Sequence, residues 1–97
     1  VVIRRDLSVG TLAAQLIHAA GESSPGELPA DTHAIALGAS GEPELLELEG
    51  QLRDLGIPHH AIREPDPPYF NQLMAIGFPP QPRVNLRRLL SKLPLLR

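Results

Sequence analysis

The sequence predicts one α/β domain spanning residues 1–97, a three-layer α/β/α arrangement in which helices cover a mixed four-stranded sheet. Short apolar runs rich in β-branched residues alternate with stretches whose leucines and alanines repeat every three or four residues. A chain of 97 residues with 42% hydrophobic content can bury one core, and has no room for two. The expected order of elements is β-α-β-α-β-β-α.

The first half of this pattern is a strand followed by a helix. Val1 to Arg5 is a β-rich apolar run, and Asp6, Ser8 and Gly10 then indicate a turn. A helix is expected from Thr11 to Glu22, because an apolar stripe repeats there at helical spacing. Its other side is polar and carries Thr11, Gln15, His18 and Glu22.

A second strand and a second helix follow a surface connection rich in Gly, Pro and Ser. The strand is expected over Thr32–Leu37, a mostly apolar run bounded by Gly38. Ser40 or Gly41 then caps a helix that Gly56 ends. Leucines spaced by three and four residues form its apolar face: Leu45, Leu48, Leu52 and Leu55.

The last three elements are two strands and a short basic helix. Ile57–Arg63 and Gln72–Phe78 are separated by about eight residues with three prolines, which leaves no space for a crossover helix and predicts antiparallel strands. A helix over Asn85–Leu93 is expected to end at Pro94.

Charge is unevenly distributed, although the net charge is only −2. The stretch from Arg83 to Arg97 contains five basic residues and no acid, whereas Glu42 to Asp54 contains five acids and one Arg. A weakly acidic chain does not coat nucleic acid through charge alone, yet Arg87 and Arg88 are candidates for phosphate contacts. The alternative is two solvated helix faces of opposite sign.

Composition also bears on where in the cell the protein is expected and on which metal sites it can form. No apolar run approaches the length of a membrane span, and VVIRR lacks the pattern of a signal peptide, so a membrane-free, cytoplasmic protein is expected. The absence of Cys excludes thiolate metal sites. His18 and Glu22 have the spacing of two metal ligands but no third ligand in a known motif, so neither a metal nor a cofactor is expected.

Several of these segments resemble a known family. The run from Arg5 to Ser8, then Gly10, Ala13–Gln15 and His18–Ala19, resembles the first strand and helix of the type 2 peptidyl-tRNA hydrolases, whose pattern is Arg-x-Asp-Leu, Gly-Lys, Ala-Ala-Gln and His-Ala. Later matches to the family's second helix, third strand and last strand are Glu44–Leu48, Gly56–Pro58, Ile62–Glu64 and Ala75–Gly77. Their joint order covers nearly the whole chain, although no single motif is strongly specific.

The chain departs from that family where chemistry is expected. Thr11 stands at the place of the family's Lys. The family's Asp, usually followed by a Gly-Arg-Thr-Gln-like segment, corresponds to Glu64, and the segment that follows here begins Pro65-Asp66 and is about four residues shorter. The chain is therefore most similar to the divergent branch called peptidyl-tRNA hydrolase domain-containing proteins, and activity survives such losses less well than fold does.

The resemblance implies a tRNA acceptor end carrying an ester, hydrolysed by an activated water. Gln15, His18 and Glu64 are the candidate catalytic residues, for hydrogen bonding a carbonyl or water and orienting that water. Gly10 and Thr11 would offer the positive end of the helix dipole to a phosphate or oxyanion. The missing Lys would be compensated by Arg63, Arg5 or backbone dipoles, and we expect Thr11, Gln15, His18 and Glu64 to line one cleft.

Each candidate has a plainer interpretation. Thr11 is an ordinary helix-start residue, and Gln15 and His18 are typical of a packing edge. Tyr69 and Phe70 would either stack on an unpaired base or plug the loop onto the core. The leading hypothesis is hydrolysis of peptidyl-tRNA or a related aminoacyl ester. The alternatives are a catalytically impaired module that binds tRNA or another ligand, and a small-molecule enzyme of the same fold. The sequence leaves the oligomeric state open, with a homodimer among the options.

Overall fold

The computed structural model describes residues 1–97 and confirms the predicted fold class. One mixed sheet has the strand order β2-β1-β4-β3. Strands β1 and β2 pair in parallel, whereas β4 is antiparallel to both β1 and β3, as the short connection between the last two strands predicts. The strands are β1 (Val2–Arg4), β2 (Leu37–Ala39), β3 (His60–Glu64) and β4 (Gln72–Gly77).

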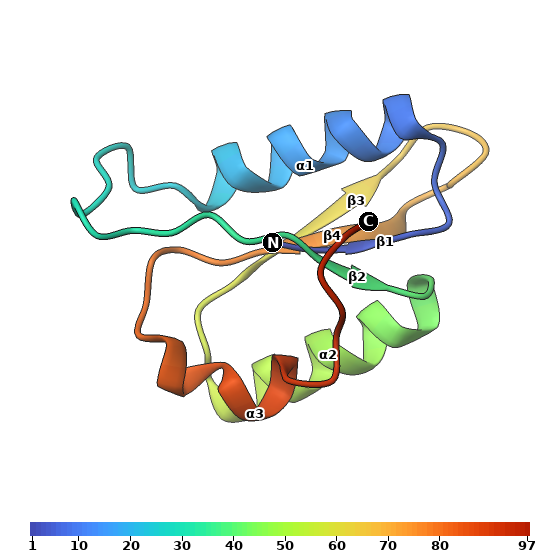
Figure 1. Ribbon diagram of the computed structural model, residues 1–97. Coiled ribbons are helices and arrows are strands. Elements are labelled where there is room, and N and C mark those ends of the chain that lie inside the picture. The colour runs from blue at the N-terminus through green and yellow to red at the C-terminus, as the bar shows by residue number, and fades with distance from the viewer.

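Helices cover both faces of this sheet (Figure 1). Helix α1 (Val9–Ser23) lies on one face, and α2 (Glu42–Leu55) and α3 (Arg87–Leu90) lie on the other. The alternation of side chains along β1 divides the core accordingly, because neighbouring residues of a strand point to opposite faces. Val2 packs with the leucines of α2, and Ile3 packs with Ala19 of α1.

Helix α1 lies close to the end of β4 because the facing residue there is Gly77. A Cβ atom at this position would come within 2.6 Å of the Ala19 carbonyl oxygen and 2.8 Å of Ser23 Oγ. Glycine thus permits the helix to approach the sheet, and Ala19 is fully buried in the contact.

Helix α2 begins and ends as its sequence predicts. Glu42 and Glu44 lie in the first turn, where the dipole favours acids, and the Glu44 carboxylate accepts a hydrogen bond from the Ser40 N–H at 2.8 Å. At the other end Gly56 has φ 67°, a left-handed conformation that suits glycine, and its N–H donates to the Arg53 carbonyl oxygen.

The second strand lies further along the chain than its sequence predicts. We expected a strand over Thr32–Leu37 ending at Gly38, but the strand runs from Leu37 to Ala39 and includes the glycine. Gly38 pairs with Ile3 in the parallel register, and a Cβ there would collide with the Arg5 side chain that lies across the strand. The glycine is therefore a residue of close approach and not a turn signal.

The C-terminal helix is shorter than expected. In place of one helix over Asn85–Leu93, there is a 3-10 turn (Arg83–Asn85) followed by the four residues of α3. A helix continued to Leu93 would place the like charges of Arg88 and Lys92 four residues apart, which is unfavourable. After Leu93 the chain runs along the edge of β2, where the Leu96 N–H donates to the Ala36 carbonyl oxygen at 2.9 Å.

Candidate functional site

A pocket of about 340 Å³ lies where α1 begins and β3 ends. Packing of α1 on Ile62 places the first turns of the helix beside the end of β3. Glu64 lies two residues after Ile62 and therefore projects from the same face of the sheet, towards α1. The residues that line the pocket are Gly10, Thr11, Ala14, Gln15, Glu64, Pro67 and Tyr69.

Gln15 and Glu64 are hydrogen bonded inside this pocket. Gln15 Nε2 donates to Glu64 Oε2 at 3.1 Å, and the Gln15 residue is only 6% exposed. A carboxylate only accepts hydrogen bonds when ionised, so Glu64 fixes which end of the amide faces it. Gln15 Oε1 is then buried without a hydrogen-bond donor. An unpaired buried acceptor costs about 1–3 kcal/mol, which a donor supplied by a water or ligand would offset.

The Glu64 carboxylate is held at both oxygens. Its second oxygen, Oε1, accepts a hydrogen bond from the Asp66 N–H at 3.3 Å, and the side chain is half-buried. Each carboxylate oxygen has a further lone pair for a water or a ligand. Glu64 is therefore oriented while still able to accept a proton from a group in the pocket.

The N-terminus of α1 contributes partial positive charge to the pocket, opposite in sign to the Glu64 carboxylate. Ser8 occupies the N-cap position, but its hydroxyl donates to Thr11 Oγ1 at 3.1 Å and caps no backbone N–H. No acidic residue lies in the first turn. The free N–H groups and the helix dipole consequently present partial positive charge at the same pocket that contains the Glu64 carboxylate.

The structure does not bring all of the predicted residues to this pocket. His18 lies outside the lining, with a half-exposed side chain whose Nε2 is 3.3 Å from Glu22 Oε1 on the same helix. His18 lies three residues beyond Gln15, about 4.5 Å further along the helix axis from the N-terminal end of α1 that lines the pocket. The expected cleft thus contains Thr11, Gln15 and Glu64, and the placement of His18 corrects that expectation.

The predicted basic residues lie elsewhere. Arg63 projects from the opposite face to Glu64, where its Nη2 atom is 3.2 Å from Glu49 Oε1 of α2. Arg87 and Arg88 belong to α3, which lies on that same far side of the sheet (Figure 1). Arg5 is exposed and lies against Gly38. None of these four cations lines the pocket.

The two aromatic residues of the loop after β3 behave differently. Tyr69 is half-buried and lines the pocket, whereas Phe70 is 71% exposed. Phe70 therefore does not plug the loop onto the core. Only Tyr69 is available as an aromatic wall for a ligand.

Arg4, the last residue of β1, is a further candidate that was not expected from the sequence. It is 7% exposed, and its guanidinium forms a bidentate ion pair with the Asp6 carboxylate. Nε donates to Oδ1 at 2.7 Å and Nη2 donates to Oδ2 at 2.8 Å. The hydrogen bond from Arg4 lowers the pKa of Asp6, and the bond to Asp6 raises the pKa of Arg4. The available signal was the opposite charge of two residues close in sequence, Arg4 and Asp6.

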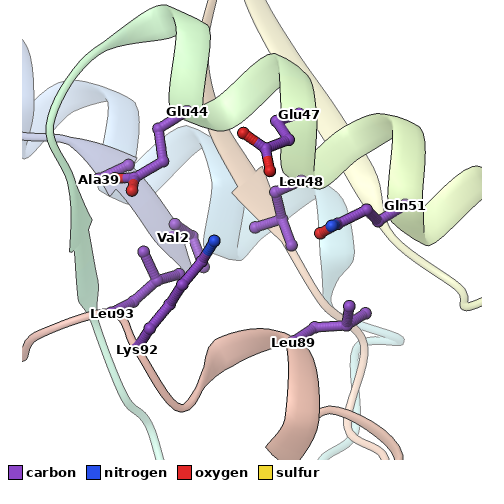
Figure 2. A pocket seen from close by; sticks show the side chains of 9 residues that line it. All are labelled: Val2, Ala39, Glu44, Glu47, Leu48, Gln51, Leu89, Lys92 and Leu93. Atoms are coloured by element: carbon purple, nitrogen blue, oxygen red, sulfur yellow. The ribbon is translucent and has the colours of Figure 1, made fainter.

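A second cavity, between α2 and the C-terminal segment, is far smaller (Figure 2). Its volume is about 10 Å³, the space of a single water molecule. Lys92 extends across it towards α2, and Leu48, Leu89 and Leu93 form its apolar wall. This cavity is a packing gap beneath the C-terminal helix and has no room for a substrate.

Comparison with known proteins adds no assignment. No family model matches this chain, and no curated protein is significantly similar to it. No group of three His, Asp or Glu side chains lies close enough together to bind a metal ion. None of the helices combines the length and the apolar character that crossing a bilayer requires.

The Arg4–Asp6 ion pair makes the free energy of unfolding depend on pH. Because the folded pKa of Asp6 lies below its ordinary value of 3.8, the pair stabilises the fold above that value and loses its effect as the pH falls through the folded pKa. Asp6→Asn should lower the free energy of unfolding near neutral pH by about 1–2 kcal/mol. The loss is smaller than for a fully buried ion pair, because the Asp6 side chain is 43% exposed and solvent screens the interaction.

Urea unfolding near neutral pH and at about pH 3 measures this effect. The difference between the parent and Asp6→Asn should be largest near neutral pH and shrink in acid. Asp31→Asn, in an exposed loop, is the matched control and should change little. A difference that stays constant with pH would show that the pair does not carry the acid dependence.

Proposed function

We propose that the protein hydrolyses the ester of a peptidyl-tRNA or a related aminoacyl ester with a water activated by Glu64. The observation that carries the proposal is the Gln15–Glu64 hydrogen bond beside the uncapped N-terminus of α1. This arrangement combines an oriented proton acceptor with free N–H donors around one pocket. Ester hydrolysis needs these two functions.

Glu64, the N–H groups of the first turn and Gln15 have separate roles in the reaction. A water hydrogen bonded to the Glu64 carboxylate loses a proton to it while the water oxygen attacks the carbonyl carbon. Negative charge develops on the carbonyl oxygen, and the N–H groups of the first turn, at Gly10 and Thr11, stabilise it. The bond from carbon to the ribose oxygen then breaks, and protonated Glu64 returns its proton to that oxygen. Gln15 keeps the carboxylate in place through Nε2.

A binding module is the second candidate, and one observation favours it. No Lys, Arg or His lines the pocket, so no side-chain cation is available there to stabilise the oxyanion. A helix terminus contributes about 0.3–1 kcal/mol in an exposed setting, which is small beside the effect of a preorganised donor set. In this alternative the pocket holds an acceptor end or another ligand without turnover.

Two assays on one preparation separate the candidates. Release of an N-acetylated amino acid from its charged tRNA measures turnover, and binding of the uncharged acceptor minihelix measures affinity. Catalysed release supports the hydrolase. Binding without catalysed release supports the module, and the absence of both would contradict the hydrolase and a module that binds tRNA.

A further inference from the structure

The aromatic wall of the pocket rests on a buried arginine that does not itself line the pocket. The guanidinium carbon of Arg4 lies 5.7 Å from the centroid of the Tyr69 ring, within the range of a cation–π contact. The Asp6 carboxylate fixes the plane of that guanidinium through two hydrogen bonds. The Tyr69 ring therefore packs against a guanidinium that has little freedom to move.

Arg4 also holds the far end of the loop that carries Tyr69. Its Nη1 donates to Gln72 Oε1 at 2.9 Å and more weakly to the Leu73 carbonyl oxygen at 3.4 Å. Gln72 is the first residue of β4, and its N–H donates to the Tyr69 carbonyl oxygen at 3.0 Å. One side chain thus connects the ring and the start of the next strand.

This loop needs such support because its backbone is strained. Phe70 has φ 44° and Asn71 has φ 73°, two consecutive residues other than glycine in the left-handed region. Asn tolerates this region, but a bulky residue such as Phe70 costs about 1–3 kcal/mol there and persists only where surrounding contacts impose it. One of those contacts is the hydrogen bond from the Asn71 N–H to the Glu64 carbonyl oxygen at 2.6 Å. The conformation that places Tyr69 at the pocket is consequently linked to the residue proposed as the base.

We propose that Arg4 is a positioning residue, which fixes the Tyr69 ring as a flat wall on which a planar group of the bound ligand stacks. Arg4 acts through Tyr69 and Gln72 and does not touch the ligand. The stacking part rests on the proposed function, because it requires a ligand with a planar group. The positioning of Tyr69 by Arg4 does not require any ligand.

Tyr69 can be observed directly, because it is the only Tyr and the chain has no Trp. Its fluorescence quenching by acrylamide reports how far the ring is open to solvent. In Arg4→Met, which keeps an unbranched side chain and removes the charge, the quenching constant should rise at least about twofold as the loop loosens. Arg83→Met, at an exposed position, is the matched control and should leave quenching unchanged.

Arg4→Lys provides the same test if Arg4→Met does not fold. Lysine keeps a positive charge but cannot form the bidentate ion pair with Asp6, so quenching should again rise, by a smaller factor. A quenching constant equal to that of the parent in a folded Arg4→Lys or Arg4→Met would overturn the proposal, whether or not the protein is a hydrolase.

Kinetics test the stacking part. Stacking of a base on an aromatic side chain is worth about 1–3 kcal/mol, so Arg4→Lys should raise KM about tenfold with kcat within about threefold. In a Tyr69→Leu background, Arg4→Lys should no longer change KM, because the group through which Arg4 acts is gone. An equal effect of Arg4→Lys in both backgrounds would refute positioning through Tyr69.

Discussion

Glu64→Gln should lower the maximal rate of ester hydrolysis by about 10²–10⁴-fold, the usual effect of removing a general base. The substitution removes charge with little change of shape. Its amide can still accept a hydrogen bond from Gln15 Nε2, the contact made at 3.1 Å in the parent, so the geometry of the pocket should persist. Affinity for the uncharged acceptor minihelix should change little, because Glu64 is assigned to the chemistry and not to binding.

Single-turnover release of the N-acetylated amino acid measures this prediction. Glu27→Gln makes the same chemical change in an exposed loop remote from the pocket and should retain the parent rate. Folding of both variants is compared by thermal melting. A folded Glu64→Gln that hydrolyses the ester at the parent rate would remove Glu64 from the mechanism.

Leu52→Ala should lower the free energy of unfolding by about 2–5 kcal/mol, the range for a leucine truncated in a packed core. Leu52 is fully buried in the cluster between α2 and the sheet. The free energy of unfolding of a domain of this size is about 5–15 kcal/mol, so the loss is a large fraction of its stability. We expect a fall in Tm of at least about 10 °C.

Leu55→Ala is the matched control on the same helix. Leu55 is 64% exposed at the last position of α2, and its truncation should change stability by no more than about 0.5 kcal/mol. Urea unfolding of the two variants tests the assignment of the core face. Equal effects at the two positions would mean that α2 does not pack through the face described here.

The long amphipathic helices and their stops followed directly from local sequence. Gly56 ended α2 as expected, and the leucine spacing identified its buried face at Leu45, Leu48 and Leu52 but not at Leu55, which is 64% exposed. The second strand and the C-terminal helix were misplaced because they depend on contacts between distant residues. Strand β3 also begins three residues later than expected, at His60 and not at Ile57. Gly38 looked like a boundary because its close approach to Arg5 is tertiary, and the basic C-terminal helix proved shorter than its leucine pattern.

The candidate site was predictable only in part for a related reason. Helical spacing placed Thr11 and Gln15 on one side of α1, and the alternation along β3 separates Glu64 from Arg63. It does not determine how far along α1 the pocket extends, and His18 lies beyond the lining. Arg4 escaped notice because a charged residue closing a short apolar strand is expected at the surface, whereas its partners Asp6 and Gln72 allow it to be buried.

The central claim is that the acceptor end binds in the pocket between α1 and β3, and the side-chain amide of Gln15 offers the most direct test. We would record nitrogen-15 NMR spectra while adding a short acceptor-end analogue whose ester is replaced by an amide that resists hydrolysis. If the acceptor end binds there, the largest shifts should occur at the Gln15 side-chain amide and at the backbone amides of Gly10 and Thr11. Saturating shifts confined to the basic segment around Arg87 and Arg88, with Gln15 unmoved, would contradict it.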